Sequence, residues 1–171
     1  MMRRATALAC ATAIVLGCVD AFAQGKPSFA GSWTPDMEKT VAANPNQPKA
    51  VPPARPMAIK QDLATWTMER VGAPVSQQGL GPQAITYTLD NKPMDVDSSK
   101  REPNERAAQV RARWVNDTVV FETTRNVKDA KVVSTVTYAR DGKYLVVTSK
   151  EPDASAPGGT KTIVTYYSPT K

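Results

Sequence analysis

The chain is predicted to form an all-β domain, a single antiparallel meander of nine or ten short strands. Two observations predict this fold class. Residues 24–171 contain 16 valines and 16 threonines but only four leucines, and β-branched residues favour strands over helices. Short segments in which apolar and polar residues alternate also recur between turn residues, which is typical of antiparallel barrels and sandwiches. We favour a barrel, with a β-sandwich as the alternative.

The first 23 residues are predicted to be a secretory signal peptide. Arg3 and Arg4 make the start basic, residues 5–19 are apolar, and residues 21–23 form a small-x-small cleavage site. We therefore expect a periplasmic or extracellular protein whose single domain spans residues 24–171. The alternative is a lipoprotein anchored at Cys18, because residues 15–18 resemble a lipobox. The apolar run is shorter than the roughly 20 residues of a membrane-spanning helix, so no transmembrane segment is predicted.

The N-terminal part of the domain is predicted to contain a strand, a short helix and a proline-rich loop. Residues 29–34 read as the first strand. Thr34 is expected to cap a helix through about residue 43, with Pro35 at its first position. The loop over residues 45–56 holds five prolines and is expected to be extended. Helix and loop together are expected to cover one mouth of the barrel.

Three further strands are predicted at residues 57–61, 65–71 and 84–89. Asp90 and Asn91 tolerate left-handed backbone angles and are expected to form a turn. A short strand near residues 94–97 is then expected to pair back on the strand that precedes this turn.

Two hairpins and a last strand are predicted in the C-terminal half. A turn at residues 116–117 would pair Val115 with Thr118, which makes one face of the hairpin apolar and places Arg111 opposite Glu122 as an ion pair. A helix over residues 103–115 is the alternative. Asp141-Gly142 is a strong signal for a hairpin between residues 131–140 and 143–150, and residues 160–168 form the last strand.

The composition excludes most catalytic and metal chemistry. The sequence has no histidine, and both cysteines, Cys10 and Cys18, lie in the signal segment. A serine–histidine triad and a cysteine nucleophile are therefore not expected, although a carboxylate pair such as Glu69 with Glu122 remains conceivable. We predict no enzyme activity and no cofactor.

An acidic cluster follows the predicted turn. Asp90, Asp95 and Asp97 lie close together with Asn91, but the mid-loop glycine and closing glutamate of a calcium loop are missing. No metal site is predicted here. The formal net charge of +6 is mild, so no nucleic-acid partner is predicted either.

Phe29-Ala30-Gly31-Ser32-Trp33 resembles the first strand of lipocalins, which carries a G-x-W signature. The resemblance implies that Trp33 closes the barrel floor under an arginine from a late strand, for which Arg140 and Arg125 are candidates. The T-D-Y signature of lipocalins is missing. The chain also resembles small uncharacterised bacterial secreted proteins, through this start, residues 87–90, residues 114–119 and the Asp-Gly pair at 141–142. That second resemblance implies no known activity.

Two functions from different classes remain open. The first is binding of a small apolar or amphipathic ligand inside the barrel. Its pocket candidates are aromatic residues that alternate with polar ones, with a filled core as the alternative: Trp33, Trp66, Tyr87, Trp114, Phe121, Tyr138 and Tyr166. The second is an envelope interaction or structural module that makes weak contact with anionic components through a basic outer surface. Its candidates are Lys100, Arg101, Arg106, Arg111 and Arg113.

Overall fold

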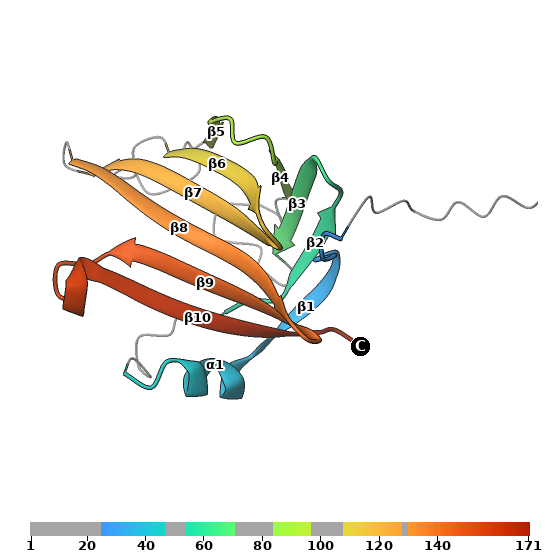
Figure 1. Cartoon of the computed structure of the whole chain (residues 1–171). Coiled ribbons are helices and arrows are strands. Elements are labelled where there is room, and N and C mark those ends of the chain that lie inside the picture. The colour runs from blue at the N-terminus through green and yellow to red at the C-terminus, as the bar shows by residue number, and fades with distance from the viewer. Residues whose placement is uncertain (1–24, 47–53, 71–83, 97–107, 128–129) are drawn as a thin grey trace, which may run out of the picture.

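In the part of the chain that the structure describes, ten antiparallel strands form one sheet that curls into a nearly closed barrel (Figure 1). This computed structural model describes residues 25–46, 54–70, 84–96, 108–127 and 130–171. The all-β prediction is confirmed, and the sheet is a barrel rather than a sandwich. The elements are β1 (Gly31–Asp36), α1 (Met37–Ala43), β2 (Met57–Gln61), β3 (Thr65–Arg70), β4 (Ala84–Thr88), β5 (Met94–Val96), β6 (Ala108–Val115), β7 (Thr118–Val127), β8 (Ala130–Asp141), β9 (Tyr144–Pro152) and β10 (Thr160–Pro169).

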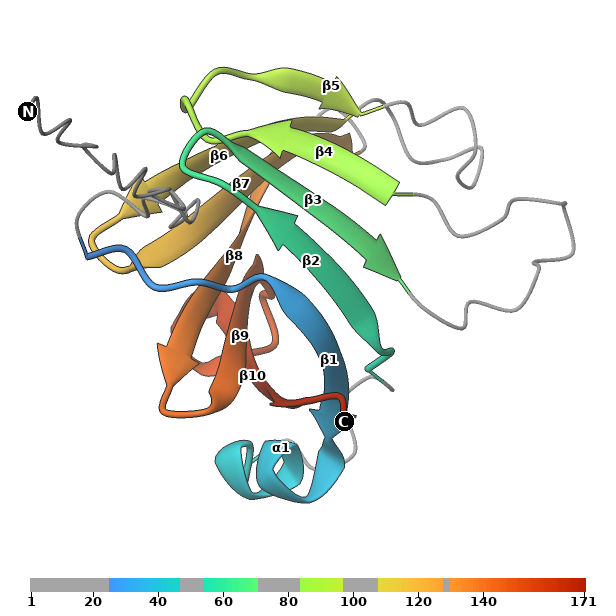
Figure 2. The same cartoon turned by 90° about the vertical axis from the view of Figure 1, so that its right-hand side faces the viewer.

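The strands follow the order β4-β3-β2-β1-β10-β9-β8-β7-β6-β5. Pairing of β1 with β10, for example Thr34 with Ser168, joins the first and last strands. The first four strands form one side of the barrel (Figure 2). Among the described strands the ladder is interrupted between β4 and β5, where a bridge joins Asp90, after β4, to Arg113 on β6.

The short strand β5 corrects one expectation. Met94 pairs with Val110 on β6 rather than with β4. Asn91 explains the change of partner, because its backbone is left-handed (φ 63°) and its N–H donates to the carbonyl oxygen of Ala112 at 2.9 Å. The chain therefore crosses from β4 to β6 at this turn.

The helix begins later than predicted. Thr34 does not cap it, because pairing of β1 with β10 continues through Pro35 to Asp36. The Asp36 carboxylate is the cap and accepts a hydrogen bond from the backbone N–H of Lys39 at 3.0 Å. An N-cap acid also suits the positive end of the helix dipole.

The hairpin of β6 and β7 has the predicted register, with Val115 opposite Thr118 and Arg111 opposite Glu122. The helix alternative for this segment is therefore wrong over residues 108–115. Arg111 and Glu122 do not form the expected ion pair. Within the described residues, the ion pairs join Lys39 to Asp141 and Lys92 to Asp90.

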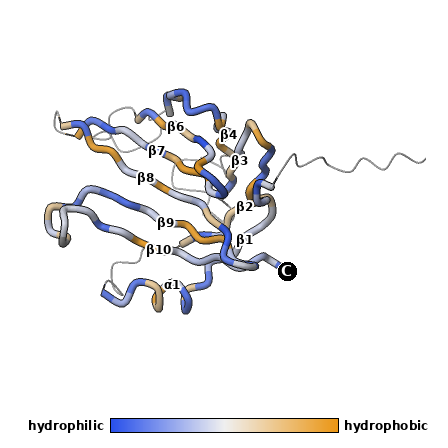
Figure 3. Tube along the Cα trace, in the orientation of Figure 1, coloured by the Kyte–Doolittle hydropathy of each residue, from blue (hydrophilic) through white to orange (hydrophobic). Residues whose placement is uncertain are grey.

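The turn between β8 and β9 lies one residue further along than predicted. Asp141 pairs with Tyr144, so Gly142 and Lys143 form the turn, and Gly142 supplies the positive φ of 56°. Tyr138 consequently pairs with Val147, whereas a turn at residues 141–142 would have paired it with Leu145. A shift of two positions keeps the same side chains on the inner face. Apolar residues recur between polar ones along β7, β8 and β9 (Figure 3).

Candidate ligand-binding cavity

Aromatic side chains fill the end of the barrel where the β2–β3 and β6–β7 turns lie. Trp66 is fully buried, and its ring centroid lies 5.5 Å from Phe29, 5.7 Å from Phe121 and 4.8 Å from Tyr138. Such tilted and edge-on contacts between rings stabilise a packed core. This end is therefore closed, and any ligand must bind further along the barrel.

Trp33 occupies the position that the lipocalin resemblance implies. It is 3% exposed, and its indole N–H donates to the carbonyl oxygen of Phe29 at 2.9 Å. The guanidinium carbon of Arg140, at the end of β8, lies 4.8 Å from the Trp33 ring centroid, which is within range for a cation–π contact. Of the two candidates, Arg140 on β8 and not Arg125 on β7 is therefore the late-strand arginine that contacts Trp33. Gly31 has a φ of 137°, which only glycine adopts readily.

Beyond the aromatic cluster the barrel interior contains a cavity of about 470 Å³. Its lining comes from β2, β3, β8, β9, β10 and the segment that leads into β2. Methionine, valine and tyrosine supply six of the ten lining residues, and polar atoms contribute about as much of the cavity surface as apolar ones. The lining residues are Ala54, Arg55, Met57, Met68, Val136, Tyr138, Val147, Ser149, Thr165 and Tyr167.

The polar groups of the lining are almost all neutral. The Tyr138 hydroxyl contacts the Met68 sulfur at 3.5 Å, while Ser149 and Thr165 add hydroxyls from β9 and β10. Arg55 is the one charged residue among the lining residues that the structure describes, and its side chain is exposed. The cavity can therefore accommodate an apolar body with a polar end.

Only one of the seven predicted pocket residues lines this cavity. Tyr138 does so, whereas Trp33, Trp66 and Phe121 are buried in the core that closes the barrel. Tyr87 is half-buried and packs edge-on against Phe121, with 5.0 Å between the ring centroids. For most of these aromatics the alternative interpretation, a filled core, is the one that the structure supports.

Trp114 and Tyr166 lie elsewhere. Trp114 is half-buried beside the β2–β3 turn, where its indole N–H donates to the carbonyl oxygen of Leu63 at 3.2 Å. Tyr166 points outward, and its ring packs against Tyr144 on the outer face. The adjacent Tyr167 is buried and lines the cavity instead. The sequence analysis named Tyr166 and not Tyr167, because both residues are tyrosines and the strand pattern alone does not show which of them faces inward.

The residues that the sequence analysis missed are mainly aliphatic. Met57 and Met68 line the cavity from the neighbouring strands β2 and β3, and Val136 and Val147 line it from β8 and β9. Each lies at an inward position of its strand. That alternation is visible in the sequence, but it does not distinguish a side chain that lines a space from one that fills it.

The helix α1 does not cover a barrel mouth, which corrects another expectation. It packs against β10, where the Thr40 hydroxyl accepts a hydrogen bond from the Tyr166 backbone N–H at 2.9 Å. Lys39 lies 3.7 Å from the ring centroid of Tyr144 and 4.6 Å from that of Tyr166. Most of the proline-rich segment, residues 47–53, lies outside the described residues.

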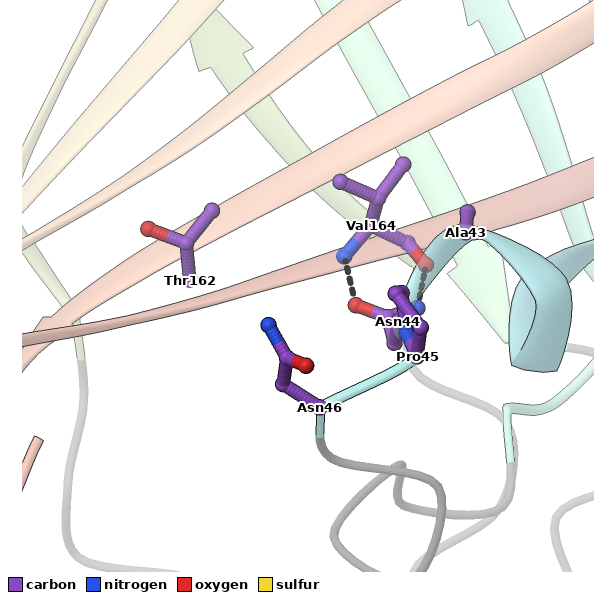
Figure 4. Close-up of a pocket in the computed structure, with 6 residues that line it drawn as sticks. All are labelled: Ala43, Asn44, Pro45, Asn46, Thr162 and Val164. Carbon is purple, nitrogen blue, oxygen red and sulfur yellow. Dashed lines mark hydrogen bonds between the residues drawn. The ribbon is translucent and has the colours of Figure 1, made fainter.

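Asn44 completes the contact between α1 and β10. Its side-chain amide donates to the Val164 carbonyl oxygen at 2.7 Å and accepts from the Val164 N–H at 3.0 Å (Figure 4). A small hollow of about 180 Å³ beside it is lined by Asn46, Thr162 and their neighbours. The amide thus occupies part of the β10 edge as a neighbouring strand would, which protects that edge from foreign strands.

The predicted basic surface is only partly described. Lys100, Arg101 and Arg106 lie outside the described residues. Arg113 donates to the Asn91 side-chain oxygen at 3.1 Å. Arg111 lines a polar hollow of about 330 Å³ on the outer face together with Gln109, Glu122, Thr124, Asn126 and Lys131.

The described acidic residues that follow β4 make hydrogen bonds to nearby groups of the protein. Asp90 accepts hydrogen bonds from the Lys92 N–H and the Thr88 hydroxyl, and these two contacts, in that order, lower the pKa of its carboxyl. Asp95 accepts from the Gln109 amide at 3.1 Å, and Asp97 lies outside the described residues. Within the described ranges there is no cluster of three or more metal-binding side chains.

Solved structures with a similar fold were found. A point variant of the fluorescent protein UnaG matches with a TM-score of 0.53 and 15% identity, over 84% of this chain and 96% of that one. A secretory abundant heat soluble protein from Ramazzottius varieornatus gives 0.50 and 14%, over 85% and 97%. Secretory abundant heat soluble protein 4 from the same organism gives 0.52 and 12%, over 87% and 100%.

These similarities show the fold alone, because all three identities are low. No protein-family model and no curated protein matches the chain in sequence. The fold is a lipocalin-like β-barrel, whereas the resemblance to bacterial secreted proteins stays a prediction. None of the helices in the described part is long and apolar enough to cross a membrane.

Proposed function

We propose that this protein is exported and binds a small apolar or amphipathic ligand inside its barrel, without catalysing a reaction. The cavity of about 470 Å³ carries the proposal. Its size lies within the roughly 300–1,000 Å³ of ordinary ligand sites, and its lining offers both apolar side chains and polar groups. Met57 and Met68 suit such a role, because flexible thioether side chains adapt to ligands of different shape.

The chemistry of the lining supports a non-catalytic role. The lining residues that the structure describes carry hydroxyl groups and one guanidinium, but no carboxylate, thiol or imidazole. A hydroxyl such as that of Ser149 needs a neighbouring base before it acts as a nucleophile, and the lining supplies none. The export part of the proposal rests on the signal-like residues 1–23.

A titration with the neutral dye N-phenyl-1-naphthylamine tests the proposal, since its fluorescence rises in apolar surroundings. Val147→Trp places a large ring in the cavity, and Val146→Trp is the matched control because Val146 faces outward from the same strand. We expect saturable binding to the wild-type protein and to Val146→Trp, and at least a tenfold loss in Val147→Trp. Equal binding by both variants, or none by the wild-type protein, would contradict the proposal.

The outer polar hollow favours a second candidate function, contact with an anionic component of the cell envelope. Arg111 and Lys131 both line this hollow, although Glu122 lies between them in the lining. Retention on vesicles that contain anionic lipid should then fall with added salt, and it should be lost in an Arg111→Glu, Lys131→Glu double variant. Unchanged retention in that variant would dismiss this candidate.

A further inference from the structure

We propose that the barrel cavity selects ligands with a negatively charged headgroup, and that Arg55 is the residue that binds this group. The inference rests on the proposed function and specifies the class of ligand. Arg55 combines three properties that the other described cations lack together. It lines the cavity, it is exposed, and it has no acidic partner among the described residues.

The position of Arg55 follows from the start of β2. Pro56 separates it from Met57, which is buried and pairs with Trp33 on β1. A residue that precedes proline is held in an extended conformation. The backbone of Arg55 is therefore anchored next to the cavity, while its exposed side chain lies where the cavity meets solvent.

Three other described cations near the sheet ends are engaged. Lys39 lies between two tyrosine rings and 3.8 Å from Asp141, and Arg140 stacks on Trp33. Arg113 donates to Asn91. Arg55 has no such contact with the residues that the structure describes, so its charge is available to a ligand. Guanidinium groups stay protonated and bind the paired oxygens of carboxylate, sulfonate and phosphate groups in a bidentate manner.

The rest of the lining fits the remainder of such a ligand. Met57, Met68, Val136 and Val147 offer an apolar surface, and no described carboxylate lines the cavity to repel an anion. An anionic group at Arg55 would stay close to water while its apolar body enters the barrel. The contribution of the charge is modest, because an ion pair at an exposed site is weak and is screened by salt.

Two dyes with the same ring system separate the headgroup from the apolar body. 1-Anilinonaphthalene-8-sulfonate carries a sulfonate that N-phenyl-1-naphthylamine lacks. In Arg55→Met we expect about fivefold weaker binding of the sulfonate dye, which corresponds to ~1 kcal/mol, and less than a twofold change for the neutral dye. Arg55→Glu should weaken the sulfonate dye by tenfold or more, and Arg55→Lys should keep most of its affinity.

Lys60→Met is the matched control, because Lys60 is an exposed cation on β2 that does not line the cavity. It should change the affinity of neither dye. A competition arm distinguishes an amphiphile from a free anion. A short-chain alkyl sulfate should displace the sulfonate dye, whereas inorganic sulfate at the same ionic strength should not.

The outcomes distinguish this inference from the proposed function. If both dyes bind, Val147→Trp abolishes both, and the Arg55 variants change neither, the headgroup assignment is wrong and the cavity function stands. Equal losses in Arg55→Met and Lys60→Met, or displacement by inorganic sulfate alone, would also overturn the assignment. If the neutral dye fails to bind the wild-type protein, the proposed function itself fails.

Discussion

Asn44 is expected to be the residue on which docking of α1 depends most strongly. It is only 6% exposed, and its side-chain amide makes three hydrogen bonds: it donates to the carbonyl oxygens of Thr40, at 2.6 Å, and Val164, and it accepts from the Val164 N–H. Each bond is worth about 1 kcal/mol net. The neighbouring hollow admits some water to the freed groups, so we expect Asn44→Ala to cost about 2–3 kcal/mol in the free energy of unfolding.

Thermal unfolding followed by circular dichroism measures this effect. For a domain of this size, about 1 kcal/mol lowers the Tm by roughly 2–4 °C, so the Tm of Asn44→Ala should fall by about 4–12 °C. Asn46→Ala is the control, because Asn46 is exposed and lines the same hollow (Figure 4). Its Tm should stay within about 1 °C of wild type. Equal Tm values for both variants would refute the reasoning.

Three further predictions concern other contacts. Arg140→Gln removes the cation over Trp33 and should cost about 1 kcal/mol in chemical denaturation, and an unchanged midpoint would count against the contact. Lys39→Met removes a cation held by two tyrosine rings and should cost a similar ~1 kcal/mol, with greater proteolytic sensitivity of α1 as a second readout. The Thr65 hydroxyl, followed by backbone N–H groups, lowers the pKa of Asp62 below its usual 3.8. Its stabilisation is therefore complete above that value and is lost as the pH falls through and below it. Between about pH 5 and pH 3, the Tm of Asp62→Asn should accordingly fall by less than the Tm of the wild-type protein. An equal fall in both proteins would contradict this prediction.

Local signals in the sequence predicted most of the fold. Alternation fixed the β6–β7 register, because a slip of one residue would have turned Phe121 outward. The Asp141-Gly142 pair marked the next hairpin but not its turn positions, since Asp141 remains in β8 and reaches Lys39 on α1. That contact joins segments about 100 residues apart, and no local pattern contains it.

The candidate site was harder to predict than the fold. Whether an inward side chain fills space or lines it depends on which residues face it from non-adjacent strands. Trp66 meets Phe121 and Tyr138 across the barrel and fills the interior there. Met68, two residues further along β3, faces the opening beyond that cluster. The lipocalin resemblance did predict the contact between Trp33 and a late-strand arginine, because this contact depends only on a short sequence motif and on one arginine, Arg140.

The structure of a complex with N-phenyl-1-naphthylamine tests the central claim most directly. The account predicts density for the dye inside the barrel, between Met68 on β3 and Val147 on β9, with the aromatic cluster around Trp66 unchanged. Dye bound only to the outer face, with side chains occupying the interior, would contradict it.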